Sequence, residues 1–238
     1  MDSLLQDLHE SLDRWMERVL EKAGVNSAPV DAELLARQKI WESYGLAAPK
    51  NYRKPPPATF DTLEPDAPLV RRQWQAAQYL GCVFQEEARR LWQESQGEEQ
   101  ISGISWINLL AQRFLVPTGW FQLACQELDF DLMEIKKRFR TAPYEILALR
   151  FLDLPRVCVV TIVDNSHVGK RKSNGYRPGK NLQAAEVEAL AYTQEYSRPK
   201  EVSKKGWVAR CWPVHSLDWK REILLSWPPE EENLEETG

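Results

Sequence analysis

Histidine is scarce in this sequence, with only three in 238 residues, at positions 9, 167 and 215. Histidine is the commonest protein ligand of metals, but histidines this far apart match no recognised metal-binding spacing. The four cysteines are also widely separated, at positions 82, 125, 158 and 211, and they form no C-x-x-C pair. Neither a zinc knuckle nor a redox motif is therefore indicated.

Other familiar signals are missing as well. The first residues lack the basic and apolar regions of a signal peptide. No stretch approaches the roughly 18 consecutive apolar residues of a membrane span. The sequence has no G-x-S-x-G, no Walker loop and no G-x-G-x-x-G. We therefore expect a cytoplasmic protein with free, mostly buried thiols, no membrane association and no bound cofactor.

The chain has enough apolar material for a substantial core, since 43% of its residues are hydrophobic and ten are Trp. Its length suits one large or two small domains. The net charge of −4 argues against a generally basic nucleic-acid-binding protein.

One segment does carry a motif, because residues 71–82 read RRQWQAAQYLGC. This resembles the R-R-x-W-x-x-A-H-E-x-G-H helix of the ImmA/IrrE family of metallopeptidases. In such a helix two His residues clamp zinc and the Glu between them acts as the general base. Gln78 stands at the first His, Tyr79 at the Glu and Cys82 at the second His.

The resemblance extends to other segments. Residues 29–36 read PVDAELLA, like the P-V-D segment with which family members open. Residues 104–117 read ISWINLLAQRFLVP, where the family has E-x-x-A-N-x-F-A-x-x-L-L-M-P. The position of the third zinc ligand falls on Ile104, and residues 101–126 contain no Asp or Glu. The segments WPVH at 212–215 and WKREIL at 219–224 are similar to the end of longer members.

The resemblance implies a zincin-like peptidase scaffold from which the metal ligands and the base have been lost. We therefore assign no catalytic and no metal-binding residues. Without the family, Gln78 and Tyr79 are ordinary surface or boundary residues of an amphipathic helix, and Cys82 is a small buried hydrophobe. The alternatives are a remodelled pocket that still binds a ligand, or an active metallopeptidase whose metal site is rebuilt around Cys82 or relocated.

Patterning predicts an α+β protein that begins with a mostly helical region. An amphipathic helix fills residues 1–24, and the degenerate peptidase-like domain covers 25–154. Helices are expected at 3–23, 31–44, 69–94 and 103–115. The proline-rich interval 46–68 offers only Ala58–Leu63 as a strand, which argues against a substrate-aligning edge.

Residues 117–153 resemble a helix-turn-helix. The second helix of that segment offers one Arg and one Glu, whereas groove-reading helices usually carry more basic or amide side chains. We therefore favour a structural role for it, as in the peptidase family.

After Pro155 the pattern changes to a small α+β module at 155–228, followed by an acidic tail at 229–238 that we expect to be disordered. Strands are expected at 157–163, 207–214 and 222–227, with a turn at Asp164-Asn165 and a helix at 182–196.

The module is locally basic, with twelve Lys or Arg against five acidic residues between positions 167 and 221. Lys170, Arg171, Lys172 and Arg177 are the predicted partner-binding residues. They could meet an acidic protein surface or phosphates, and a solvated hairpin is the alternative.

Function follows from these two regions together. Active members of the family are associated with cleaving helix-turn-helix repressors. We therefore expect a regulatory pseudopeptidase that binds a protein, such as a repressor, or a small ligand. Nucleic acid is the lesser alternative, and the oligomeric state stays open.

Overall fold

The computed structural model describes residues 3–48, 67–96, 105–216 and 219–228. The chain divides into two compact units, Met1–Arg150 and Phe151–Gly238. The first unit is helical, and the second contains one antiparallel sheet and a helix. The predicted α+β class is therefore confirmed. The change of unit lies at Arg150/Phe151, whereas the sequence pattern placed it at Pro155.

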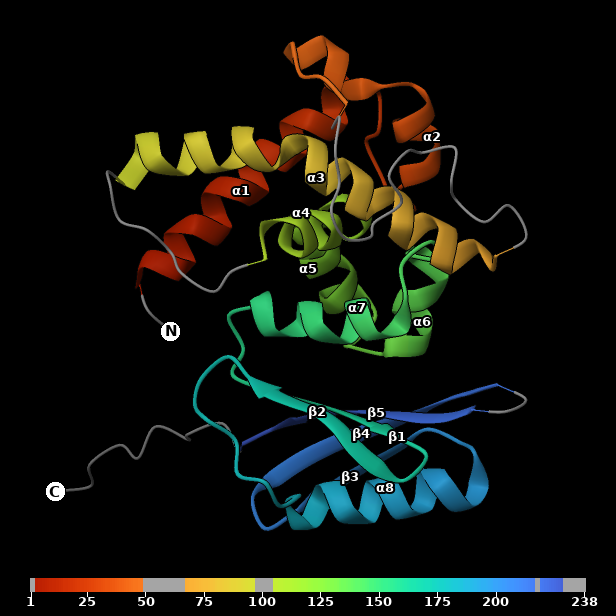
Figure 1. The fold of residues 1–238 in the computed structure, drawn as a ribbon. Helices are drawn as coiled ribbons and strands as arrows, with labels where there is room; N and C mark the ends of the chain where they lie inside the picture. The colour runs from red at the N-terminus through yellow and green to blue at the C-terminus, as the bar shows by residue number, and fades with distance from the viewer. Residues whose placement is uncertain (1–2, 49–66, 97–104, 217–218, 229–238) are drawn as a thin grey trace, which may run out of the picture. The chain divides into compact units, whose positions relative to one another are not determined.

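The first unit is made of short and long helices (Figure 1). They are α1 (Ser3–Lys22), α2 (Ala32–Arg37), the 3-10 helix η1 (Ile40–Tyr44), α3 (Leu69–Gln96), α4 (Trp106–Leu115), α5 (Thr118–Glu127), α6 (Leu132–Arg138) and α7 (Tyr144–Arg150). The helices expected at 3–23, 69–94 and 103–115 agree with α1, α3 and α4 within three residues. Among the described helices, none is both long and apolar enough to cross a membrane.

Helix α1 packs against α3 and α4 through the apolar stripe seen in the sequence. Leu8, Leu12, Trp15 and Met16 are all buried. The helix ends at Lys22, and Gly24, with a φ of 76°, then turns the chain in a conformation that favours glycine. The stripe therefore belongs to the core of the first unit, as expected.

The single helix expected over 31–44 is wrong, because the chain breaks at Lys39, which has φ of 51°. In a continuous helix, residues five apart lie about 140° from each other around the axis. Ala36 and Trp41 would then face different sides. Both are buried, and the break before η1 turns the second into the core.

Two segments that carry the family resemblance are joined by the side chain of Gln73, which is only 1% exposed. Its Oε1 accepts from the Ala32 backbone N–H at 2.8 Å, and its Nε2 donates to Asp31 Oδ1 at 2.7 Å. Asp31 also caps α2 by accepting from the Leu34 backbone N–H at 2.9 Å. The start of α2 is therefore held on α3.

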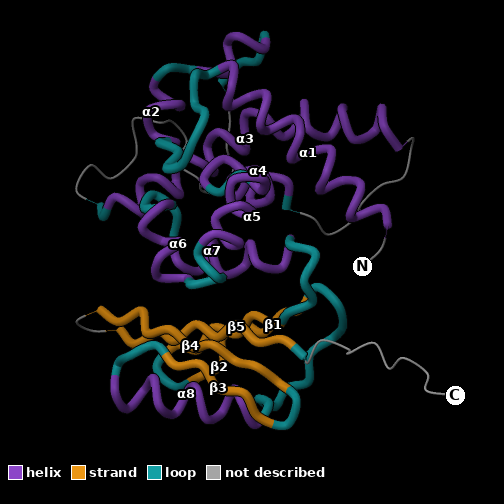
Figure 2. Tube along the Cα trace, turned by 180° about the vertical axis from the view of Figure 1, so that it is seen from behind, coloured by secondary structure: helices purple, strands orange, loops and turns teal. Residues whose placement is uncertain are grey.

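The second unit is a five-stranded antiparallel sheet with the order β2-β1-β5-β4-β3. Helix α8 lies along one face of it (Figure 2). The elements are the 3-10 helix η3 (Phe151–Asp153), β1 (Val159–Asp164), β2 (His167–Ser173), α8 (Ala184–Tyr196), β3 (Lys200–Lys204), β4 (Trp207–Ser216) and β5 (Trp219–Trp227). Strands β1, β4 and β5 and the helix α8 were expected at these places.

Strand β3 was not expected, because its sequence KEVSK is polar except for Val202. It forms because it pairs with β4 across a tight turn, in which Lys205 and Gly206 both have positive φ. Strand β1 pairs with β2 on one side and β5 on the other. The strand suggested at Ala58–Leu63 lies outside the described residues, as does the tail 229–238.

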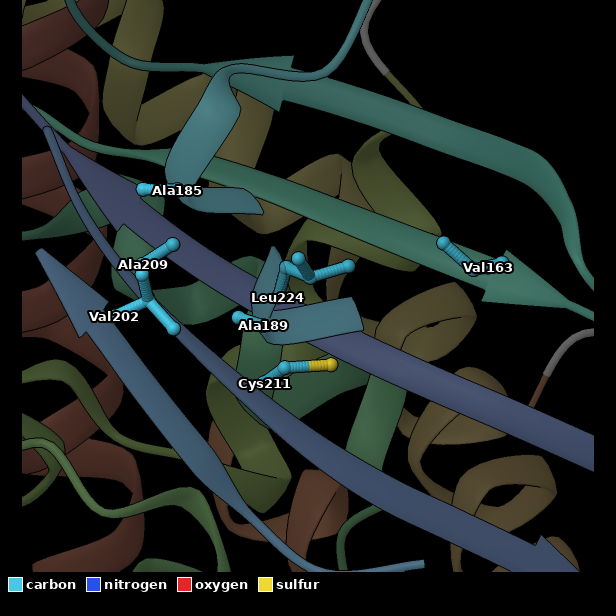
Figure 3. Close-up of a cluster of buried hydrophobic side chains, with 7 residues drawn as sticks. All are labelled: Val163, Ala185, Ala189, Val202, Ala209, Cys211 and Leu224. Atoms are coloured by element: carbon cyan, nitrogen blue, oxygen red, sulfur yellow. The ribbon is translucent and has the colours of Figure 1, made fainter. Parts of the chain in front are cut away.

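Small side chains let α8 lie close to the sheet. Figure 3 shows Ala185 and Ala189, one helical turn apart on α8, beside side chains of β1, β3, β4 and β5. The buried cluster comprises Val163, Ala185, Ala189, Val202, Ala209, Cys211 and Leu224. Burial of these apolar groups fixes which face of each strand points toward α8.

Candidate functional site

The segment that resembles the zinc helix lies where α3 crosses α4, and Gly81 makes that crossing possible. A Cβ at this position would lie 2.5 Å from the carbonyl oxygen of Ile107 in α4. Because that contact is with backbone, neither helix could yield by rotating a side chain. The glycine of the motif therefore has a packing role that requires no metal.

Gln78, at the first-ligand position, is partly exposed beside the same crossing. Its Nε2 donates to Asn108 Oδ1 at 3.1 Å, which links α3 to α4. Both groups are neutral amides, which neither titrate near neutral pH nor bind zinc well. The structure thus brings together two residues of the resembling segments, but as a helix-to-helix hydrogen bond.

Tyr79, at the position of the general base, is a core residue. It is 6% exposed, and its ring meets Trp41 edge-on with centroids 5.5 Å apart. The expectation of a surface or boundary residue is therefore wrong for Tyr79. The cause is η1, which places Trp41 against a side of α3 that the periodicity of α3 alone does not mark as covered.

Cys82, at the second-ligand position, is buried with a reduced thiol, as expected. The Gln85 side chain on the next helical turn donates to its Sγ at 3.8 Å. Ile104, at the third-ligand position, lies outside the described residues. Within the described part of the chain, no three His, Cys, Asp or Glu residues are grouped so as to hold a metal ion.

The predicted basic surface lies on β2, which forms one edge of the sheet. Lys170 and Lys172 are exposed on this strand, and Arg177 is exposed in the loop that follows it. Because side chains alternate along a strand, Lys170 and Lys172 share one face and Arg171 points to the other.

Arg171 is not available to a partner, which corrects its assignment. Its two terminal nitrogens bond both carboxylate oxygens of Glu186 on α8, at 2.8 and 2.9 Å. The side chains of this pair are 8% and 0% exposed. Arg171 also donates to the hydroxyl of Thr161 on β1 and to the carbonyl of Gly179. The arginine thus anchors β2 to α8 within the unit.

The Glu186 carboxylate has further hydrogen-bond donors, which compensate for its burial in the apolar interior. It accepts from Ser226 Oγ on β5 at 2.6 Å and from the Gln183 backbone N–H at 2.7 Å, the latter capping α8. The network joins α8 to three strands. The sequence signal was an acidic residue in the first turn of an otherwise apolar helix face, but its basic partner could not be identified from it.

Sequence reasoning also did not identify a partner for His215. Its Nε2 lies 2.8 Å from the buried carboxylate of Glu222. Gln194 on α8 donates to the other oxygen of that carboxylate at 3.3 Å, and Ser197 Oγ lies 3.4 Å from the Nδ1 of His215. This cluster satisfies a carboxylate that would otherwise be costly to bury.

Two local environments shift ionisable groups. Arg221 bonds both oxygens of Asp164, at 2.6 and 2.9 Å, and holds the pKa of that carboxyl below its usual value of 3.8. Burial raises the pKa of the Cys158 and Cys211 thiols to about 12. Both thiols therefore stay protonated at neutral pH and are poor nucleophiles.

Comparison with models of known protein families and with curated proteins returned no match. The likeness to the ImmA/IrrE peptidases therefore rests on residues 29–36 and on the matching residues of α3, α4, β4 and β5.

Proposed function

We propose that this protein is a non-catalytic, ImmA/IrrE-like regulator that acts by binding a partner protein in the cytoplasm. The observation that carries the first half of the proposal is the packing of Tyr79 against Trp41. A general base must reach the attacking water, whereas this ring is buried against Trp41 of η1.

The other former site residues support the same conclusion. Gln78 is engaged with Asn108, and the Cys82 thiol is buried beside Gln85. We infer that residues 71–82 serve to pack α3 against α4. On this proposal the first unit is a zincin-like scaffold, kept for its shape.

The helix-turn-helix-like part, α5 to α7, is proposed to be structural as well. Arg150, the basic residue expected on its second helix, is buried. Its guanidinium donates to the Val116 carbonyl at 3.2 Å and to the Thr118 hydroxyl. A side chain used in this way cannot read base edges in a groove, which favours a protein partner over nucleic acid.

The second half of the proposal is binding through the basic edge strand β2. Lys170 and Lys172 are exposed there, and Arg177 is exposed nearby. Such a surface suits an acidic protein region. The resemblance suggests a helix-turn-helix repressor, which a copy of the peptidase without its chemistry would bind without cleaving.

Metal analysis of the purified protein tests the first half. We expect no stoichiometric zinc, and an unchanged melting temperature after chelator treatment, since no metal-binding energy is linked to folding. One tightly held zinc per chain, with Cys82 among its ligands, would instead establish a rebuilt metallopeptidase site.

A pull-down from the native host tests the second half. The double variant Lys170→Glu/Lys172→Glu should lose the captured partner. The control Arg198→Glu/Lys205→Glu changes the net charge equally at exposed residues of the same unit and should retain it. Equal loss with both variants would mean that net charge, rather than β2, determines binding.

A further inference from the structure

We propose that the partner binds β2 as an added strand, by supplying an extended acidic segment that pairs with the open edge of the sheet. This inference rests on the proposed function, because it specifies how the same basic surface recognises its partner.

The backbone of β2 is available for such pairing. The strand is at the end of the order β2-β1-β5-β4-β3, and among the described residues only β1 pairs with it. On its outer side, alternate residues present backbone N–H and C=O groups. A peptide can pair with these groups, whereas a nucleic acid could use only the charged side chains.

Side-chain hydrogen bonds also fix β2 to the rest of its unit. Arg171, in the middle of β2, is tied to Glu186 on α8 by two hydrogen bonds. Asn174, just after the strand, donates to the carbonyls of Leu154 and Arg156, both at 2.9 Å. A pre-ordered edge reduces the entropy lost on binding.

The side chains specify the chemistry of the added strand. Lys170 and Lys172 are exposed two residues apart, and the apolar side chain of Val168 on the same strand is 46% exposed. An incoming strand that alternates acidic and apolar residues would match this pattern through cross-strand pairs.

The same features discourage pairing with a second copy of this chain. Two β2 strands side by side would bring lysines together, and like charges directly opposite each other are destabilising. The irregular pairing between Ile162 and Val163, opposite Gly169, further disrupts a flat edge. An acidic segment meets no such charge repulsion.

The other edge, β3, is a less suitable place. It carries the acidic residue Glu201, which pairs with Arg210 and whose charge would oppose an acidic segment, and its Lys204 pairs with Glu188. Lys200 lies over the ring of Tyr192 at 4.9 Å. Edge β3 is therefore the internal control for edge β2.

The test uses the full chain and two synthetic peptides of equal charge. One alternates Glu and Val, and the other has proline at its central Val, which prevents continuous strand pairing. Fluorescence anisotropy at low salt measures affinity, and amide hydrogen exchange reports which strand is covered. We expect the alternating peptide to bind more than about tenfold tighter, and to protect amides of β2 but not of β3.

The two levels of the proposal fail differently. If both peptides bind equally well and Lys170→Glu/Lys172→Glu abolishes both, strand addition is wrong and binding through the basic surface stands. If neither peptide binds, or if a single-stranded oligonucleotide displaces the alternating peptide while leaving β2 amides unprotected, both are wrong. Protection of β3 instead of β2 would also overturn the inference.

Discussion

Replacing Arg171 by Met separates a structural role for this residue from the partner-binding role that its position in the basic run suggested. Among the described residues, the variant leaves the fully buried Glu186 carboxylate with the Ser226 hydroxyl and the Gln183 N–H as its donors. Removing one member of a buried ion pair typically costs about 3–5 kcal/mol, because the other charge stays buried without compensation.

The free energy of unfolding is measured by urea titration, with tryptophan fluorescence as the probe. We expect Arg171→Met to lose about 3–5 kcal/mol. Lys172→Met changes the next side chain, which is exposed on the other face, and should stay within about 0.5 kcal/mol of the parent protein.

A double variant shows whether the loss comes from the uncompensated carboxylate. Arg171→Met/Glu186→Leu removes both charges, so it should be more stable than Arg171→Met alone. The helix cap that Glu186 supplies would still be missing, at a cost of about 1 kcal/mol. If Arg171→Met proved as stable as the parent but lost the partner, the ion pair would be unimportant and Arg171 would be a binding residue.

Three further predictions follow from particular contacts. Gly81→Ala should destabilise the protein by about 1–2 kcal/mol in urea titration, because the clash with the Ile107 carbonyl outweighs the gain in helix propensity. The control Gly119→Ala, whose new methyl group would meet the side-chain tip of Glu17, should show no loss of stability. An equal effect at both positions would contradict the close crossing of α3 and α4. Burial raises the pKa values of the Cys158 and Cys211 thiols to about 12. Both should therefore resist a thiol reagent at pH 8 in the native protein and react in denaturant. Rapid labelling of either cysteine in the native protein, located by mass spectrometry, would refute its burial. Because the pKa of Asp164 is lowered in the folded protein, its stabilising contribution is present above pH 3.8, the usual pKa, and is lost as pH falls through the lower folded-state pKa. The stability of Asp164→Asn should therefore depend less steeply on pH in acid. An unchanged stability profile between about pH 2 and 5 would show that the pairing of Asp164 with Arg221 adds nothing to stability.

Elements with a complete local signal could be predicted from the sequence. The apolar stripe of α1 and the glycine that follows the helix lie within one continuous segment, and so do the β-branched run of β1 and its Asp164-Asn165 turn. In these segments the periodicity, the capping residue and the stop signal agree, so a single conformation satisfies all of them.

The candidate site was only partly predictable, because the identity of its residues is local information whereas their exposure is not. The replacement of the zinc ligands is a matter of residue identity, and the sequence alone shows it. It also shows that Lys170 and Lys172 form a basic run. Whether each side chain in such a run is exposed depends on strand alternation and on what covers each face.

Tertiary structure decided the rest, because the deciding partners are distant in the chain. The break at Lys39 turns the chain so that Trp41 is buried. Tyr79 is a core residue because Trp41 packs against it. Strand β3 forms despite its polar sequence because β4 completes its hydrogen bonds. Arg171 was predicted as a surface cation, yet Glu186, fifteen residues away on another element, holds it inside the unit. Local sequence sets what each segment can form, but the need to bury apolar surface and to pair every buried charge selects among those possibilities only when the segments meet.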